Sequence, residues 1–147
     1  MAGFTLRQAT KPPMVEKWTK NSTTDTGAIG DIYYWNAGTD AALPGDTSVV
    51  SCDRAGILLK ATVSGDTYID VQIPTPDQLW EATSTNASNT THTGHNMVLS
   101  TQNTVNNTGS NSTDTKAIIV QVGTIGATSD NRLRVRFSQM ANGLLNN

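Results

Sequence analysis

The sequence predicts an all-β fold, organised as a small barrel or a sandwich. One observation is composition: threonine, asparagine and serine supply 23, 13 and 11 of the 147 residues. Threonine is β-branched and suits a half-exposed pleated surface, while asparagine, serine and glycine favour turns. The other observation is patterning, because short apolar segments alternate with turn residues and no helical apolar period is sustained. No internal repeat is evident.

Residues 1–26 are predicted to form an extended N-terminal arm, followed by a single β-barrel domain over residues 27–147. The first segment contains Pro12 and Pro13, a polar run, and large apolar residues without a regular period. Either this arm frays, or it becomes ordered on a partner or a neighbouring subunit. In the second case the expected interaction residues are Phe4, Leu6, Arg7, Lys11 and Trp18.

The first half of the domain contains three segments with strand patterns. Residues 31–40 predict a strand that runs into a turn, and residues 48–63 predict two strands around a turn at 53–56. The next segment alternates in a way typical of a half-buried strand. Its apolar face carries Ile69, Val71 and Ile73, and its polar face carries Tyr68, Asp70 and Gln72.

The second half continues the pattern, with long polar loops between strands. Pro74 and Pro76 disfavour central ladder positions, so the chain bends there before a strand with Leu79 and Trp80 as core candidates. Residues 97–105 and 116–123 predict two further strands. The loops expected between these elements are residues 83–96 and 106–115.

The last strand, at residues 131–137, raises the main functional question because it places arginines at every second position. Leu133, Val135 and Phe137 would face the core, and the arginines would face outward. Such a face can bind nucleic acid, bind an acidic protein partner through guanidinium groups, or protect an edge strand from unwanted pairing. The residues concerned are Arg132, Arg134 and Arg136.

Charge and cysteine content exclude several classes of protein. The formal net charge of −2 argues against a dedicated nucleic-acid binder, because such domains are usually basic. Cys52 is the only cysteine, so no intrachain disulfide is possible. The N-terminus lacks the apolar core of a signal peptide and no apolar run approaches a membrane span, so no membrane partner is expected.

No motif for catalysis or cofactor binding is present in the sequence. His92 and His95 share a loop, but zinc requires three or four ligands and no carboxylate lies near them in the sequence. Cys52 follows an apolar segment, where inert cysteines are common, and no activated nucleophile or phosphate-binding glycine loop is recognisable. We therefore expect no enzymatic activity, no cofactor and no metal.

The order of strands and turns over residues 55–138 resembles the small β-barrel cement, or head decoration, proteins of tailed bacteriophages. The segments that carry this resemblance are YIDVQIP, QLWEAT, GHNMVLST, AIIVQVG and RLRVRFS. The resemblance implies an SH3-like or tulip-like barrel. It also implies a virion structural protein that binds the outside of the major capsid protein shell, as a homotrimer, and stabilises the shell. The basic arm resembles the extensions that such proteins lay across neighbouring subunits.

Two other functions remain open at this stage. The first is another phage structural role, such as a tail, fibre or host-adhesion module, whose threonine- and asparagine-rich loops would face a receptor. The second is an OB-like protein that binds single-stranded nucleic acid, with Tyr33, Tyr34 and Trp35 as stacking candidates beside the arginines.

Overall fold

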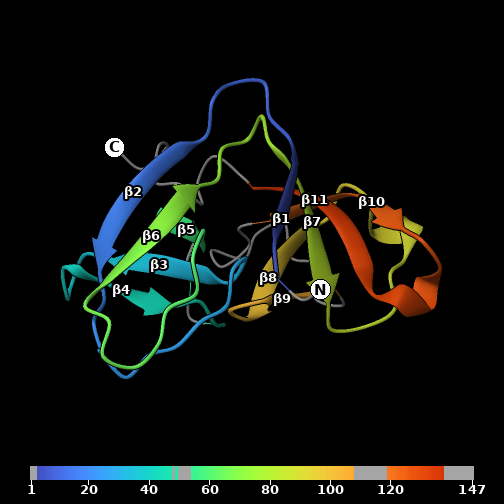
Figure 1. The fold of residues 1–147 in the computed structure, drawn as a ribbon. Coiled ribbons are helices and arrows are strands. Elements are labelled where there is room, and N and C mark those ends of the chain that lie inside the picture. The colour runs from blue at the N-terminus through green and yellow to red at the C-terminus, as the bar shows by residue number, and fades with distance from the viewer. Residues whose placement is uncertain (1–2, 48, 50–53, 108–118, 138–147) are drawn as a thin grey trace.

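The structure is a computed structural model, and it describes residues 3–47, 49, 54–107 and 119–137. The described chain is nearly all β-structure, arranged as two curled sheets that lie side by side (Figure 1). This arrangement confirms the predicted all-β, barrel-like fold. No helix in the described ranges is long and apolar enough to cross a membrane.

The first sheet contains five strands in the order β2-β6-β5-β3-β4, and every neighbouring pair is antiparallel. A single parallel bridge between Lys20 and Ala42 then brings β4 back to the end of β2. The sheet therefore curls almost into a closed ring. Its strands are β2 (Met14–Thr19), β3 (Ile32–Asn36), β4 (Ala41–Pro44), β5 (Arg54–Leu58) and β6 (Tyr68–Ile73).

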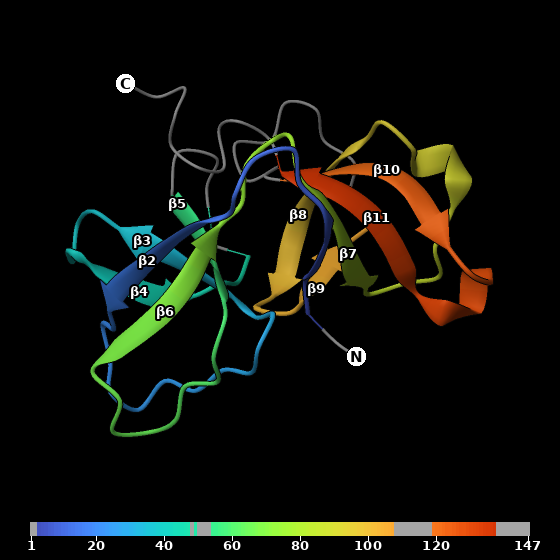
Figure 2. The ribbon, with the colours of Figure 1, turned by 45° about the horizontal axis from the view of Figure 1, so that its top comes forward.

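The second sheet has the order β1-β7-β11-β10-β8-β9, and a parallel pairing between β7 and β9 closes it. The N-terminal strand β1 pairs with the start of β7, beside the point where β9 joins the same strand (Figure 2). Its strands are β1 (Thr5–Gln8), β7 (Leu79–Ser84), β8 (Asn96–Thr101), β9 (Thr104–Asn106), β10 (Ile119–Ile125) and β11 (Arg132–Phe137). Short 3-10 turns occur at Thr90–His92 and Thr128–Asp130.

Apart from β1, the two sheets have the same topology. Strands β2 to β6 pair with one another in the same pattern as β7 to β11. In each set the third strand closes the sheet by a parallel contact with the first strand: β4 meets β2, and β9 meets β7. The register also agrees: Glu16 faces Val71 in the first sheet, and Trp80 faces Val135 in the second. Counterpart residues are separated by 64 positions in this pair of strands. The structure therefore contains an internal repeat that the sequence did not reveal.

The repeat is hidden in the sequence because many counterpart positions keep their burial but not their residue type. Trp18, Tyr33 and Leu58 are buried in the first sheet, and their counterparts Ala82, Met97 and Gln121 are buried in the second. In the strand pair β6 and β11, only Val71 and Val135 are identical. A core as a whole must be filled, but single positions in two different cores can hold side chains of different size and polarity, so a repeat of this kind leaves little similarity in the sequence.

Two apolar clusters fill the two sheets. The smaller cluster lies inside the first sheet and includes Trp18, Tyr33 and Val71. The larger cluster lies inside the second sheet, and it also receives Ile32 and Ile57 from the outward faces of β3 and β5. Because the outside of the first sheet packs into the core of the second, the two sheets share one continuous body.

The strands predicted within 31–40, 68–73 and 131–137 and the strand with Leu79 and Trp80 are confirmed, whereas β4 was not predicted. The first of the two strands expected within 48–63 lies mostly outside the described residues. Residues 54–56 belong to β5 rather than to a turn, and Gly56 fits there because a side chain would meet Val71 and Trp18. The single strand expected over residues 97–105 is a hairpin of β8 and β9, because the chain turns at 102–103. The predicted loop at 106–115 lies mainly outside the described residues.

The N-terminal segment, expected to be an extended arm over residues 1–26, is part of both sheets in its described residues. Its described residues supply a strand to each sheet, β1 to the second and β2 to the first. Phe4 and Trp18 are 3% and 4% exposed, so their side chains already lie in the two cores. The irregular apolar spacing that suggested an arm reflects one short segment that serves two separate cores.

Candidate interaction surface

The predicted arginine strand, β11, lies in the middle of the second sheet. Leu133, Val135 and Phe137 are buried, as predicted, and the arginines lie on the opposite face. Strand β11 pairs with β7 on one side and with β10 on the other. The interpretation that the arginines protect an exposed sheet edge is therefore wrong, because β11 is not an edge strand.

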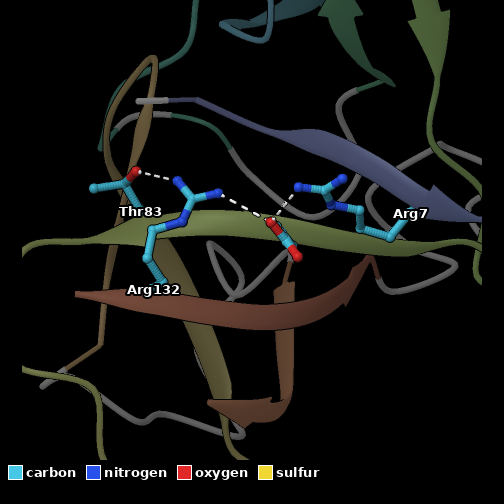
Figure 3. Close-up of polar contacts among 4 residues, drawn as sticks. Arg7, Thr83 and Arg132 are labelled. Carbon is cyan, nitrogen blue, oxygen red and sulfur yellow. Dashed lines mark hydrogen bonds and ion pairs between the residues drawn. The ribbon is translucent and has the colours of Figure 1, made fainter. Parts of the chain in front are cut away.

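Two of the candidate arginines share one carboxylate. Arg7 of β1 and Arg132 of β11 both donate to Oε2 of Glu81 on β7, at 2.9 and 3.3 Å (Figure 3). Arg132 also donates to the Thr83 hydroxyl at 3.0 Å. The hydrogen bond from Arg7, together with the nearby charges of both arginines, lowers the pKa of Glu81. This cluster ties three neighbouring strands together on the outer face of the sheet.

Arg136 is held by backbone oxygens at the junction between the two sheets. Its guanidinium donates to the carbonyl of Asp77 at 2.8 Å and lies 3.4 Å from that of Pro76. The Asp77 carboxylate in turn accepts the backbone N–H and hydroxyl of Thr10. Hydrogen bonds from the hydroxyls of Thr75 and Thr10 lower the pKa of Asp77 to about 2. Arg136 is thus a structural residue of this junction.

Arg134 differs from its two neighbours because its side chain is exposed. Within the described residues it forms no side-chain hydrogen bond or ion pair. Its backbone, in contrast, is fixed in the ladder opposite Glu81 and Gly123. Of the three arginines predicted from the sequence, Arg134 is the one that is available to a partner.

The candidate residues of the N-terminal segment fall into two groups. Phe4 and Trp18 are core residues, since Phe4 packs on Phe137 and Trp18 packs edge-on against Trp35. Leu6 is partly buried and packs against the larger cluster. Arg7 remains 55% exposed although it pairs with Glu81. Lys11 is exposed on the connection between β1 and β2.

Lys11 also lines a cavity of about 440 Å³ between the β1–β2 connection and the β6–β7 connection. Met14 and Asp77 also line this cavity, so its lining contains both apolar and charged groups. Together with Arg7 and Arg134, Lys11 forms the part of the predicted set that remains accessible.

A polar cluster that the sequence reasoning missed lies near β2. Glu16 accepts hydrogen bonds from the Arg54 guanidinium and from the Trp18 indole, both at 2.7 Å, and Arg54 lies over the Trp18 ring. The bond from Arg54 lowers the pKa of Glu16 against the opposing effect of burial. The order β2-β6-β5 in the curled sheet brings Arg54 of β5 to Glu16 of β2, and no local sequence signal indicates this contact.

Other candidate chemistry finds little support in the described residues. His92 and His95 stack with ring centroids 5.7 Å apart, but no cluster of three or more metal-ligating side chains occurs in the parts of the chain described. Tyr33 and Tyr34 are buried, so they present no stacking surface for bases. Burial, with the charges of Asp25 and Asp31, raises the pKa of Tyr33 to about 12. Cys52 lies outside the described residues.

Comparison with known proteins gives no relative of this chain: no family model, no curated protein and no solved structure matches it. The choice between an SH3-like and a tulip-like barrel therefore stays a prediction.

Proposed function

We propose that the protein is a virion structural protein, a cement or decoration protein that binds the outer surface of a phage capsid as a homotrimer. The observation that carries the proposal is the exposed Arg134 on the rigid outer face of the second sheet. A guanidinium on a fixed backbone can bind a carboxylate of a protein partner in a defined geometry. The major capsid protein would supply that carboxylate, and the resemblance at residues 55–138 supports this identity of the partner.

The burial pattern favours a protein partner over the OB-like alternative. A single-strand binder needs aromatic side chains on its surface beside a basic groove. Here Tyr33 and Tyr34 are buried, and Trp35 is half-buried against the first core. The arginines also share their face with Glu81, which would oppose a phosphate backbone.

Binding of charge variants to undecorated capsids tests the proposal. Arg134→Glu reverses the charge, and Arg134→Gln removes it without placing a second carboxylate beside Glu81. Lys60→Glu, on an exposed residue of the β5–β6 connection, is the matched control. We expect both Arg134 variants to bind capsids at least about tenfold more weakly, because an interfacial charge pair is lost. Equal weakening by Lys60→Glu, or none by either Arg134 variant, would exclude this face as the interface.

The copy number of the protein in purified particles separates the proposed role from the other phage structural roles. A cement protein is expected in hundreds of copies per particle, and a tail or fibre module in tens or fewer, because cement must cover the whole shell. Deletion of residues 1–20, an obvious test of an arm, is unsuitable because it would remove both β1 and β2.

A further inference from the structure

Among the described residues, the first sheet has an open strand edge at the position where the second sheet holds β1. In the second sheet, β1 pairs antiparallel with the start of β7 and brings Thr5 opposite Glu81 and Leu6 opposite Trp80. The counterparts of Glu81 and Trp80 in the first sheet are Lys17 and Glu16. Strand β2 is the edge strand of the first sheet, and no described strand pairs with this part of its outer edge.

The exposed side chains along β2 are consistent with a strand that accepts a partner. Alternate residues of an edge strand direct their N–H and C=O groups away from the sheet, where another strand can pair with them. Met14 and Val15 are 48% and 57% exposed, although large apolar residues are costly at an unprotected edge. Leu79, the counterpart of Val15, pairs with Gln8 of β1 in the second sheet.

Charge identifies the kind of strand that fits. On the second sheet, Arg7 of β1 meets the Glu81 carboxylate. At the open edge the residue in the place of Glu81 is Lys17, whose side chain is 64% exposed. The strand that fits this edge therefore carries an acidic residue where β1 carries Arg7. Lys17 already pairs with Asp70 at 3.0 Å, but its ammonium group has three donors and can bind a second carboxylate.

The same charge pattern disfavours a second copy of the chain as the occupant. Strand β1 of another copy would bring Arg7 against Lys17, which is a like-charge contact. Strand β2 of another copy could pair antiparallel about a two-fold axis centred on Glu16 or Lys17. That residue would then lie opposite the same residue of the other copy, which is again a contact between like charges.

We propose that the edge of β2 binds an extended segment of another protein that pairs antiparallel with residues 14–17 and carries an acidic side chain beside Lys17. Backbone hydrogen bonds would supply the affinity, and Lys17 would supply the charge preference. The site is separate from Arg134 on the second sheet and does not depend on the capsid role. Failure of the capsid-binding experiment would therefore leave this proposal unaffected.

Two synthetic peptides test the proposal on the full chain. The first copies residues 3–10, GFTLRQAT, and the second contains glutamate in place of Arg7. Each peptide is titrated into isotope-labelled protein while the backbone amide signals are followed by NMR. We expect the acidic peptide to shift the amide signals of β2 and to bind about fivefold more tightly than the arginine peptide, because it pairs with Lys17 rather than opposing it.

A double variant supplies the matched control. Lys17→Glu combined with Asp70→Lys keeps the ion pair of this face with its charges reversed, so the fold retains the contact. In this variant the arginine peptide is expected to bind more tightly. The proposal is wrong if neither peptide shifts the signals of β2, or if the preference does not reverse. It is also wrong if these signals broaden with protein concentration alone, because the occupant would then be a second copy.

Discussion

The Arg7 guanidinium donates to the Glu81 carboxylate at 2.9 Å, joining two residues that are 74 positions apart in the sequence. This contact fixes β1 to the outer face of the second sheet, where Glu81 also binds Arg132. The counterpart of Glu81 in the first sheet is Lys17, which has only an exposed pairing with Asp70. Glu81 thus links three strands (β1, β7 and β11), whereas Lys17 at the equivalent position links two (β2 and β6).

Replacement of Glu81 by glutamine should destabilise the fold measurably. The variant weakens charge-assisted hydrogen bonds from two arginines to a side chain that is 17% exposed, so we expect a loss of about 1–2 kcal/mol. Lys17→Gln at the equivalent position should cost less than about 0.5 kcal/mol, because its ion pair is exposed. Urea unfolding of the two variants measures the difference. Similar losses for both would show that the Glu81 cluster stabilises the fold no more than the exposed Lys17–Asp70 pair does.

Acid stability should depend on Asp77. Its pKa in the folded protein is about 2, below its ordinary value of 3.8, so its contribution is complete above about pH 4 and disappears as the pH falls towards 2. Asp77→Asn should therefore show a smaller drop in Tm between pH 5 and pH 2.5 than the wild-type protein. Glu81 and Glu16, whose pKa values are also lowered, keep part of the acid dependence in the variant. An unchanged drop would contradict the role of the Thr10 and Thr75 hydrogen bonds.

Truncation of Phe4 tests whether the N-terminal segment is part of the core. Phe4 is buried and packs on Phe137 with ring centroids 5.4 Å apart, so Phe4→Ala should cost about 3–5 kcal/mol. Met14→Ala changes a half-exposed residue of the same segment and should cost less than about 1 kcal/mol. Thermal unfolding of the full chain compares them. Equal stability of Phe4→Ala and wild type would restore the interpretation of a free arm.

The buried Lys20 should be required for two loops of the first sheet. Its ammonium group donates to the carbonyls of Asp25 and Val63 and to the hydroxyl of Thr62. Lys20→Met would leave these acceptors without their donor, so we expect a loss of about 1–3 kcal/mol. Lys60→Met, on an exposed lysine nearby, should change stability by less than about 0.5 kcal/mol. Faster hydrogen exchange at residues 62–66 in the Lys20 variant alone would support this role.

Local patterns in the sequence were sufficient to predict strands whose two faces differ in polarity. The alternation in β6 and β11 predicted both the strands and their buried faces, because one face of each lies in a core. The first part of β5, residues 54–56, and the β8–β9 hairpin were harder to predict. In these places the structure depends on a neighbouring strand, such as the approach of Val71 to Gly56, rather than on local turn chemistry.

Contacts between distant segments could not be predicted from local patterns. The arginines of β11 were recognised as a face, but their partners were not, because Glu81 and the carbonyls of residues 76–77 meet them only after the sheet forms. The internal repeat was also hidden, since counterparts such as Trp18 and Ala82 share burial but not size. The open edge of β2 follows from the difference between the two sheets, since only the second sheet has a strand in the place of β1 among the described residues.

The pairing of β1 with β7 also determines when β1 can join its sheet during synthesis. Strand β1 leaves the ribosome first, but its partner Glu81 follows 74 residues later. At about 5–20 residues per second, β1 waits roughly four to fifteen seconds for β7. All the strands of the first sheet are synthesised within that interval, and β2, next to β1 in the sequence, can already pair with β6. Phe4 and Leu6 therefore stay exposed to solvent until the second sheet begins to form, which is the period when a chaperone can bind them.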